Sequence, residues 1–181
     1  MEFTHLQLQK WRNFYSVDVE LGSRVFIVGP NASGKSNLLD ALRFLRDIAS
    51  VGSGFEDAVR RRGGVSKIRA LSARRYPEVG VSVTIGDSGN SGAMWTYTLA
   101  FTQDNQRRPY ITNEQVYQDE KRLLKRPDAD DRRDRERLRQ THLEQISANH
   151  DFREVAEFLT SVRYQHIVPQ LVREPDPTRA S

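Results

Sequence analysis

Eight residues, 29–36, have the types and the spacing that a loop needs to hold a polyphosphate. Gly29, Gly34, Lys35 and Ser36 fit the pattern G-x-x-x-x-G-K-[ST]. Glycine allows the dihedral angles and the close backbone approach that are needed when several N–H groups point into one concavity. Lys35 can reach the terminal phosphates, and the Ser36 hydroxyl can ligate Mg²⁺. The loop therefore predicts a site for a nucleotide with Mg²⁺.

The elements on either side of the loop are those that such a site requires. Residues 25–28 are apolar without alternation, which predicts a strand buried on both faces of a sheet. After the loop, apolar residues recur at helical spacing, and we expect a helix over residues 35–50. The N-terminus of this helix would add its partial positive charge to the phosphate site.

Alternation of apolar and polar residues predicts strands in two other parts of the chain. Residues 6–8 and 17–21 indicate a hairpin whose bend is at Arg12 and Asn13. A short helix is expected within residues 51–64, which glycines punctuate. Three further strands are expected to form an antiparallel sheet: residues 79–85, 95–101 and 110–117. We expect the aromatic residues of this sheet in its core rather than against a ligand: Trp95, Tyr97 and Phe101.

The last third of the chain is more polar. Residues 119–140 carry charges of opposite sign three and four positions apart and are interrupted by Pro127, so we expect a solvated helix or a mobile insertion. Residues 152–159 predict an amphipathic helix, which Asp151 and Glu154 would begin as a capping-box-like pair. Residues 162–181 end the chain with a short apolar, strand-like piece and a polar tail that contains proline.

The composition excludes several classes of protein. The mean hydropathy is −0.68, and no apolar run approaches the roughly 18 residues of a membrane helix. The absence of cysteine excludes disulfides and thiolate metal sites within the chain. The N-terminus has no secretory signal pattern, so we expect a cytoplasmic location and no membrane partner. The net charge of +4 permits nucleic acid binding without arguing for it.

Positive charge is concentrated in one stretch of the chain. Residues 58–77 contain no acid, and their basic residues are Arg60, Arg61, Arg62, Lys67, Arg69, Arg74 and Arg75. These side chains could contact DNA phosphates, in which case added salt would weaken the interaction. In the alternative interpretation they lie on the rim of the fold, solvated or paired with acids from elsewhere in the chain.

The letters around the two glycines resemble the phosphate loop of ABC-type ATPases of the SMC, RecF and OLD (overcoming-lysogenization-defect) group. In that family G-x-N-x-S-G-K-S is followed by N-[LI]-L-D-A-[LI], and residues 29–42 read GPNASGKSNLLDAL. Upstream, LQLQKWRNFYSVDVEL is similar to the first hairpin of the family. Downstream, VRYQHIVPQLVREP is similar to a segment of bacterial AAA-type ATPases of this group, many of them linked to DNA repair or anti-phage defence. The resemblance is closest over residues 6–47.

The resemblance implies ATP and Mg²⁺ as cofactors, with Ser36 as the metal ligand. It implies that the nucleotide contacts the loop and the start of the helix: Gly29, Pro30, Asn31, Ala32, Ser33, Gly34, Lys35, Ser36 and Asn37. It also places Arg12 and Asn13 beside the nucleotide. The implied partner is a second copy, or a chain carrying the second lobe, with ATP between two heads.

Hydrolysis in this family also needs an apolar strand that ends in Asp-Glu, the Walker B strand. Asp119 and Glu120 follow QVYQ, which is too polar for such a strand. There is no L-S-G-G signature loop, and His166 precedes its apolar neighbours instead of following them. The catalytic residues are therefore unknown from the sequence.

Other residues of catalytic type have no convincing context. The scattered histidines are expected to be surface or packing residues: His5, His142 and His150. The glutamine that senses Mg²⁺ in ABC-type sites stays unassigned among Gln103, Gln115 and Gln118.

We therefore expect an α/β fold of the P-loop NTPase class. It would be an ABC-ATPase-like N-terminal lobe with a mixed sheet around residues 25–28, an antiparallel β-subdomain over about residues 79–118, and following helices. Residues 1–118 would form the nucleotide-binding lobe. Residues 119–181 would form a charged and amphipathic helical region that ends where the second lobe would begin, as in a truncated, split or decayed protein.

The leading functional hypothesis is the ATP-binding lobe of an ATPase acting on DNA in repair or phage defence. DNA would contact Arg60, Arg61, Arg62, Lys67 and Arg69. One alternative is a non-catalytic module, in which the nucleotide stabilises a surface for a partner. Another is a small P-loop kinase, although the antiparallel insert and the first hairpin do not fit it.

Overall fold

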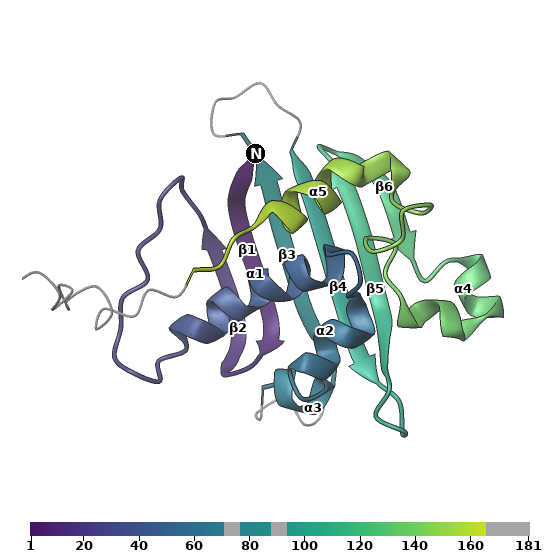
Figure 1. Cartoon of the computed structure of the whole chain (residues 1–181), viewed down its shortest axis with the longest axis horizontal. Coiled ribbons are helices and arrows are strands. Elements are labelled where there is room, and N and C mark those ends of the chain that lie inside the picture. The colour runs from purple at the N-terminus through teal and green to yellow at the C-terminus, as the bar shows by residue number, and fades with distance from the viewer. Residues whose placement is uncertain (71–76, 88–93, 166–181) are drawn as a thin grey trace, which may run out of the picture.

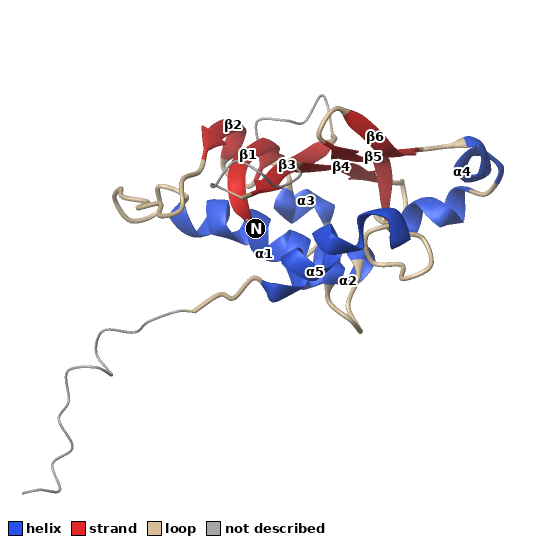
Figure 2. Cartoon of the chain, turned by 90° about the horizontal axis from the view of Figure 1, so that it is seen from above, coloured by secondary structure: helices blue, strands red, loops and turns tan. Residues whose placement is uncertain are grey.

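The structure is a computed structural model that describes residues 1–70, 77–87 and 94–165. It has two layers, a six-stranded sheet and a set of helices that covers one face of it (Figures 1 and 2). The strand order is β2-β1-β3-β4-β5-β6, and every neighbouring pair is antiparallel. The strands are β1 (Glu2–Trp11), β2 (Phe14–Glu20), β3 (Val79–Gly86), β4 (Trp95–Gln103), β5 (Pro109–Gln118) and β6 (Lys121–Arg126).

The period of two along each strand separates the two faces of the sheet. Leu8 of β1 lies opposite Val81 of β3, and Val81 lies opposite Leu99 of β4, all buried beneath the helices. The neighbouring row faces the other way and is polar, for example Ser82, whose hydroxyl lies 2.8 Å from that of Thr98. One face of the sheet therefore forms the core, and the other is polar.

Helix α1 forms the centre of the helical layer. Its buried side packs on the sheet through Phe44, whose ring centroid lies 5.2 Å from that of Trp11 and 5.3 Å from that of Phe101. Helix α5 packs on α1, and Phe158 of α5 contacts Phe3 of β1 edge to face. The helices are α1 (Lys35–Ala49), α2 (Phe55–Arg61), α3 (Val65–Ile68), α4 (Ala129–Arg133), the 3₁₀ helices η2 (Arg135–Arg139) and η3 (His150–Phe152), and α5 (Arg153–Ser161).

Most of the predicted elements are confirmed. The hairpin, the helix after the loop, the short helix, the three later strands and the amphipathic helix are β1–β2, α1, α2, β3–β5 and α5. Trp95, Tyr97 and Phe101 are buried, as expected for core residues. The predicted β-subdomain is continuous with the first hairpin, because β3 pairs with β1. The division at residue 118 stays a prediction, although β6 continues the same sheet beyond it.

The prediction for residues 25–28 is wrong. They form no strand, and Phe26 and Val28 are each 88% exposed. β1 already pairs with β2 on one edge and with β3 on the other, and no described strand lies beside residues 25–28. The mixed sheet expected around them is therefore absent from the described part, where all pairs are antiparallel. Figure 1 shows this segment leaving the sheet beyond β2 and returning at the start of α1.

The prediction for residues 119–140 is also wrong. This segment begins with an edge strand, β6, and continues through α4 and η2. Arg126 and Asp131 are buried, so the segment is anchored to the sheet rather than solvated along its length. Charge spacing in the sequence did not indicate which of these residues find a partner in the interior.

The start of α5 also differs from the prediction. Asp151 belongs to η3, and the N-cap of α5 is Phe152, with no side-chain capping bond. Arg74, Arg75, His166 and the strand-like piece after residue 165 lie outside the described residues. Within the described ranges, no helix has the length and apolar character needed to cross a membrane.

Candidate functional site: the loop before α1

The loop ends at a glycine that no other residue could replace without movement. Gly34 has a φ of 104° and forms the N-cap of α1 without a side-chain bond. A Cβ at this position would lie 2.4 Å from the side-chain nitrogen of Asn13 and 2.8 Å from the ring of Phe14. The loop and the first hairpin therefore touch at Gly34, where any other residue would be strained and would displace the Asn13 and Phe14 side chains.

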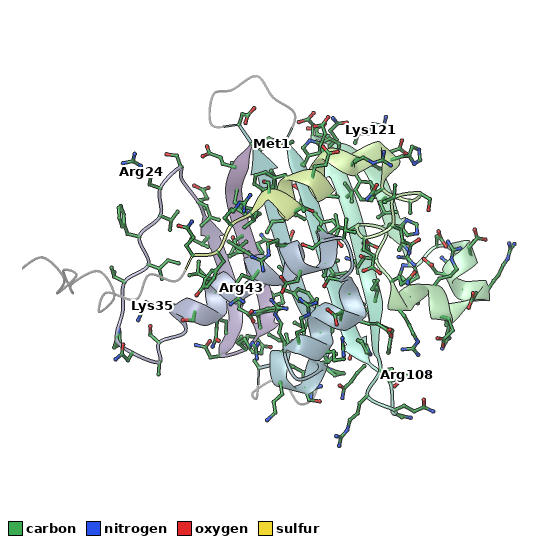
Figure 3. All side chains as sticks on the ribbon, viewed as in Figure 1. Met1, Arg24, Lys35, Arg43, Arg108 and Lys121 are labelled. Atoms are coloured by element: carbon green, nitrogen blue, oxygen red, sulfur yellow. The ribbon has the colours of Figure 1, made fainter. Side chains whose placement is uncertain are left out.

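The start of α1 is arranged for an anion. Its first turn contains no acid and its first N–H groups have no helical acceptor, so the positive end of the helix is uncompensated. The Lys35 ammonium donates to the carbonyl oxygens of Gly29 and Pro30, both at 2.7 Å, and so lies inside the curve of the loop. Figure 3 shows Lys35 at this end of α1, and the Ser36 residue beside it is exposed.

These features fit a phosphate group. Backbone N–H groups, a lysine inside the loop and a hydroxyl at the helix start are the donors that a P-loop uses for phosphates and Mg²⁺. Pro30, Asn31, Ala32 and Ser33 are exposed along the loop, as a ligand-binding backbone requires. The direct contacts of these residues with nucleotide stay predictions.

The bend of the first hairpin lies against the loop, as the resemblance implied. Asn13 donates to the carbonyl oxygen of Ser33 at 3.3 Å and accepts from the Asn37 side chain at 2.8 Å. Trp11 donates to the Asn37 carbonyl oxygen at 2.9 Å. The bend therefore holds both the end of the loop and the first turn of α1.

The Arg12 guanidinium turns away from the loop. It donates to Oδ2 of Asp40 at 2.9 and 3.3 Å and to the Lys67 carbonyl oxygen at 3.2 Å. A cavity of about 580 Å³ lies beside it and is also lined by Lys67 and Arg69. A direct contact between Arg12 and nucleotide stays a prediction, because its charge is matched by Asp40 in this structure.

The absence of the Walker B carboxylates from the chain stays a prediction. Asp119 and Glu120 form the turn between β5 and β6, where Asp119 accepts from the backbone N–H of Met94 at 2.9 Å. No group of three or more His, Asp or Glu side chains that could hold a metal ion occurs among the described residues. Ser36, the predicted metal ligand, lies in the first turn of α1, and its metal-binding role stays a prediction.

The basic stretch is divided by the fold. Arg62 is 6% exposed and pairs with Asp40 and Asp47 of α1, both at 3.0 Å, so the prediction that it contacts DNA is wrong. Arg60 and Arg61 are 81% and 58% exposed and share Asp57 as an ion-pair partner. The sequence signal for the buried pairs was available: Asp40 and Asp47 are seven residues apart and therefore share one face of α1.

Two titratable residues of the 141–149 segment have shifted pKa values, and the sequence pattern did not indicate Glu144. Burial lowers the pKa of His142 to about 4, which agrees with its prediction as a packing residue. Burial raises the pKa of Glu144 to about 7, although this carboxylate accepts the first N–H of α2, from Phe55. His5 and His150 pair with Asp18 and Asp151 on the surface, as expected.

Comparison with known proteins identifies the family of the chain. Residues 24–172 match the family described as "AAA domain, putative AbiEii toxin, Type IV TA system". The DNA replication and repair protein RecF of Clavibacter sepedonicus is 37% identical over 103 residues, which are 55% of this chain and 25% of that protein. Endonuclease GajA of Bacillus cereus (strain VD045) is 43% identical over 47 residues, 26% of this chain and 8% of that protein.

The matched part thus spans about a quarter of the length of the first of these relatives. A solved SMC ATPase structure covers 97% of this chain and 93% of its own at 14% identity and a TM-score of 0.48, a likeness too low to argue from. The family match covers far more than half of the residues. The chain belongs to this AAA-domain family, and its similarity to RecF supports the resemblance to ABC-type ATPases of the SMC, RecF and OLD group.

Proposed function

We propose that the chain is an ATP-binding lobe of an SMC/RecF/OLD-like ATPase that acts on DNA in repair or anti-phage defence. The observation that carries the proposal is the position of Lys35, inside a loop that ends at an uncapped, acid-free helix start. The names of the relatives, a DNA repair protein and an endonuclease, support DNA as the substrate. A protein of this kind would work in the cytoplasm, where ATP and DNA occur together.

In this proposal each residue of the site has a binding role. The N–H groups of the loop and of the first turn of α1 bind phosphate oxygens, and Lys35 leaves the Gly29 and Pro30 carbonyls to pair with the terminal phosphates. Ser36 would hold Mg²⁺, which neutralises phosphate charge when it is bound. Asn13 keeps the end of the loop in place through Ser33.

Measurement of ATP affinity by calorimetry tests the proposal. Lys35→Ala should lower the affinity at least about 100-fold, because it removes a charge that pairs directly with phosphate. Lys121→Ala is the matched control, since Lys121 lies at the far end of the molecule (Figure 3) and its loss should leave the affinity unchanged. Equal affinities of the wild type and Lys35→Ala would contradict a phosphate-binding role of the loop.

The partner in this proposal is a second copy or a chain that carries the other lobe. Residues 25–28 support it, because four consecutive apolar residues that are exposed in this part of the chain fit a strand that a partner would cover. Sedimentation with and without ATP and Mg²⁺ tests for self-association. A monomer under both conditions would leave the separate chain as the partner and exclude the second copy.

DNA contact is proposed through the exposed part of the basic stretch. Arg60, Arg61 and Lys67 are exposed, whereas Arg62 is occupied by α1. Arg60→Ala with Arg61→Ala should weaken binding to duplex DNA and lower its salt slope by about two, one for each phosphate that is no longer neutralised. The control is Arg132→Ala with Arg133→Ala, an exposed arginine pair on α4. An equal effect of both double variants would contradict a specific DNA surface.

A non-catalytic module is the second candidate. It is favoured by the position of Asp119 and Glu120, which lie on the turn after β5, a strand that is only partly buried. ATP binding without hydrolysis, alone and with DNA, is the expected result for such a module. Hydrolysis that is abolished in Lys35→Ala would contradict it, and phosphate transfer only to an acceptor would indicate the kinase instead.

A further inference from the structure

Asp40 joins three segments that surround the phosphate loop. Its Oδ2 accepts from Arg12 of the hairpin bend at 2.9 and 3.3 Å. Its Oδ1 accepts from Nε of Arg62, at the end of α2, at 3.0 Å, and the Nη2 of Arg62 lies 3.0 Å from the same oxygen. The Asp40 side chain is 16% exposed, and those of Arg12 and Arg62 are 24% and 6% exposed. We call these three residues the Asp40 cluster.

The geometry of the cluster leaves little freedom. Each carboxylate oxygen of Asp40 lies within reach of two nitrogens of a different guanidinium group, so the carboxylate is held between two planar, rigid sets of donors. Arg12 has a φ of 55°, a conformation that a non-glycine residue keeps only when its surroundings hold it. Its backbone N–H and its side chain are both held, by the Ile68 carbonyl and by Asp40.

The residue after Arg12 is the one that touches the loop. Asn13 bonds Ser33 and Asn37, and its side chain packs where Gly34 has no Cβ. Because Arg12 and Asn13 are adjacent in the chain, fixing the Arg12 side chain on Asp40 fixes the direction in which Asn13 points. The Asp40 cluster therefore lies one step behind the contacts that shape the loop.

We propose that Asp40 is a positioning residue of the nucleotide site, which acts on the phosphate loop through Arg12 and Asn13 and links α2 to it through Arg62. The proposal rests on the ATP-binding role proposed above and adds a residue to it. Asp40 touches no part of the loop itself among the described contacts. Its removal should act on ATP only through the order of the bend.

Asp47 provides a matched control. It lies on the same face of α1 and pairs with Arg62 and Arg46, at 3.0 and 2.7 Å, but not with Arg12. Its side chain is 11% exposed, close to that of Asp40. Asp47→Asn therefore removes a comparable charge pair and should lower the melting temperature to a similar extent without reaching the bend.

The first experiment uses the nucleotide-free protein. Asp40→Asn should speed amide hydrogen exchange about tenfold in residues 11–14 and 33–37, because the bend loses its anchor. Asp47→Asn should not change exchange there. Equal exchange in the two variants would overturn the proposal, and this result does not depend on ATP binding.

The second experiment measures ATP affinity. Asp40→Asn should weaken it about tenfold, Asp47→Asn less than about twofold, and Asp40→Glu should restore most of the affinity. Combined with Asn13→Ala, Asp40→Asn should add little, because both variants release the same part of the loop. Additive effects would overturn the pathway through Asn13. If the wild type binds no ATP while the exchange results hold, the proposed function fails and the positioning of the loop stands.

Discussion

Two regions of the molecule reverse the usual distribution of side chains between water and interior. The first is residues 25–28, and the second is the buried group of Glu114, Arg126 and Asp131. Phe26 and Val28 are apolar and 88% exposed. Arg126 is charged and 1% exposed, and Glu114 and Asp131 are fully buried. The two regions lie at opposite edges of the sheet, the first beyond β2 and the second at β5 and β6 (Figure 1).

The buried charges are complete within this chain. Arg126 donates to both oxygens of Asp131, at 2.7 and 2.9 Å, and to Glu114 at 2.9 Å. Glu114 also accepts from the Tyr97 hydroxyl at 3.1 Å and from the backbone N–H groups of His142 and Leu143 at 3.0 and 3.2 Å. Such burial is tolerated because the charges and their hydrogen-bonding groups find partners.

The ionisation of this group follows from the same contacts. Burial raises the pKa of Glu114, while the bonds from His142 and Arg126 oppose that shift. Burial would also raise the pKa of Asp131, but its bonds to Arg126 and Asp128 lower it well below the usual range. The network therefore anchors the irregular 127–149 segment to the sheet by polar contacts rather than by apolar packing alone.

The exposed apolar residues, in contrast, lack partners within the described part of the chain. No described strand lies beside residues 25–28, so their side chains cannot be covered by this part of the chain. Burial in this chain therefore depends on the available partners more than on the polarity of the side chain. At the β5–β6 edge of the sheet the buried charges are paired within this chain. The other edge, next to the phosphate loop, presents an apolar surface of the kind that marks an interaction site.

The largest expected effect on stability is at the β5–β6 edge of the sheet. Arg126→Met should destabilise the chain by about 3–5 kcal/mol, because it leaves two buried carboxylates without their counter-charge. Arg122→Met is the control, an exposed arginine on the same strand, for which a change within about 0.5 kcal/mol is expected. Urea unfolding measures both. A destabilisation below about 1 kcal/mol for Arg126→Met would show that the network contributes little.

A smaller effect should distinguish Glu144, which lies next to this network and is bonded to α2. Its folded pKa of about 7 is above the ordinary value of 4.5, so its contribution to stability is fully present below about pH 4.5 and is lost as pH rises through 7. Glu144→Gln cannot be charged and escapes that loss. Relative to wild type, the variant should gain about 2 kcal/mol between pH 5 and pH 8.

The difference between the two proteins isolates Glu144, because His142 changes stability in the opposite direction over part of this range. The folded pKa of His142 is lowered to about 4, so its effect raises stability as pH rises from 4 to 6.5 in both proteins. Glu157→Gln, at an exposed glutamate that lines the same cavity of about 770 Å³ as Glu144, checks for a general effect of charge removal. A constant difference between Glu144→Gln and wild type across the pH range would contradict a buried, titrating Glu144.

The smallest expected effect on stability is at residues 25–28. Phe26→Ser should change the unfolding free energy of the isolated chain by less than about 0.5 kcal/mol, because the ring is already in water. Phe44→Ser, in the core, should cost about 3–5 kcal/mol. A destabilisation above about 2 kcal/mol for Phe26→Ser would show that residues 25–28 are buried in solution and would remove the contrast between the two edges.

Local sequence patterns were sufficient to predict the loop, the helix that follows it, the bend that touches it and most strands. These features depend on spacing within a few residues: glycine at Gly34, apolar residues at helical spacing after Lys35, and alternation in β3 and β4. Local geometry is sufficient for them, because a residue's neighbours along an element lie at fixed positions.

Which residues are buried, in contrast, depends on the tertiary fold. Residues 25–28 have the pattern of a buried strand and no neighbouring strand among the described residues, while Arg126 and Asp131 have the pattern of a solvated helix and a complete set of partners. The pairing of Asp40 with Arg12 and Arg62 likewise joins residues 28 and 22 positions apart. Periodicity shows which side chains share a face, but their burial and charge pairing depend on what packs against that face from distant parts of the chain.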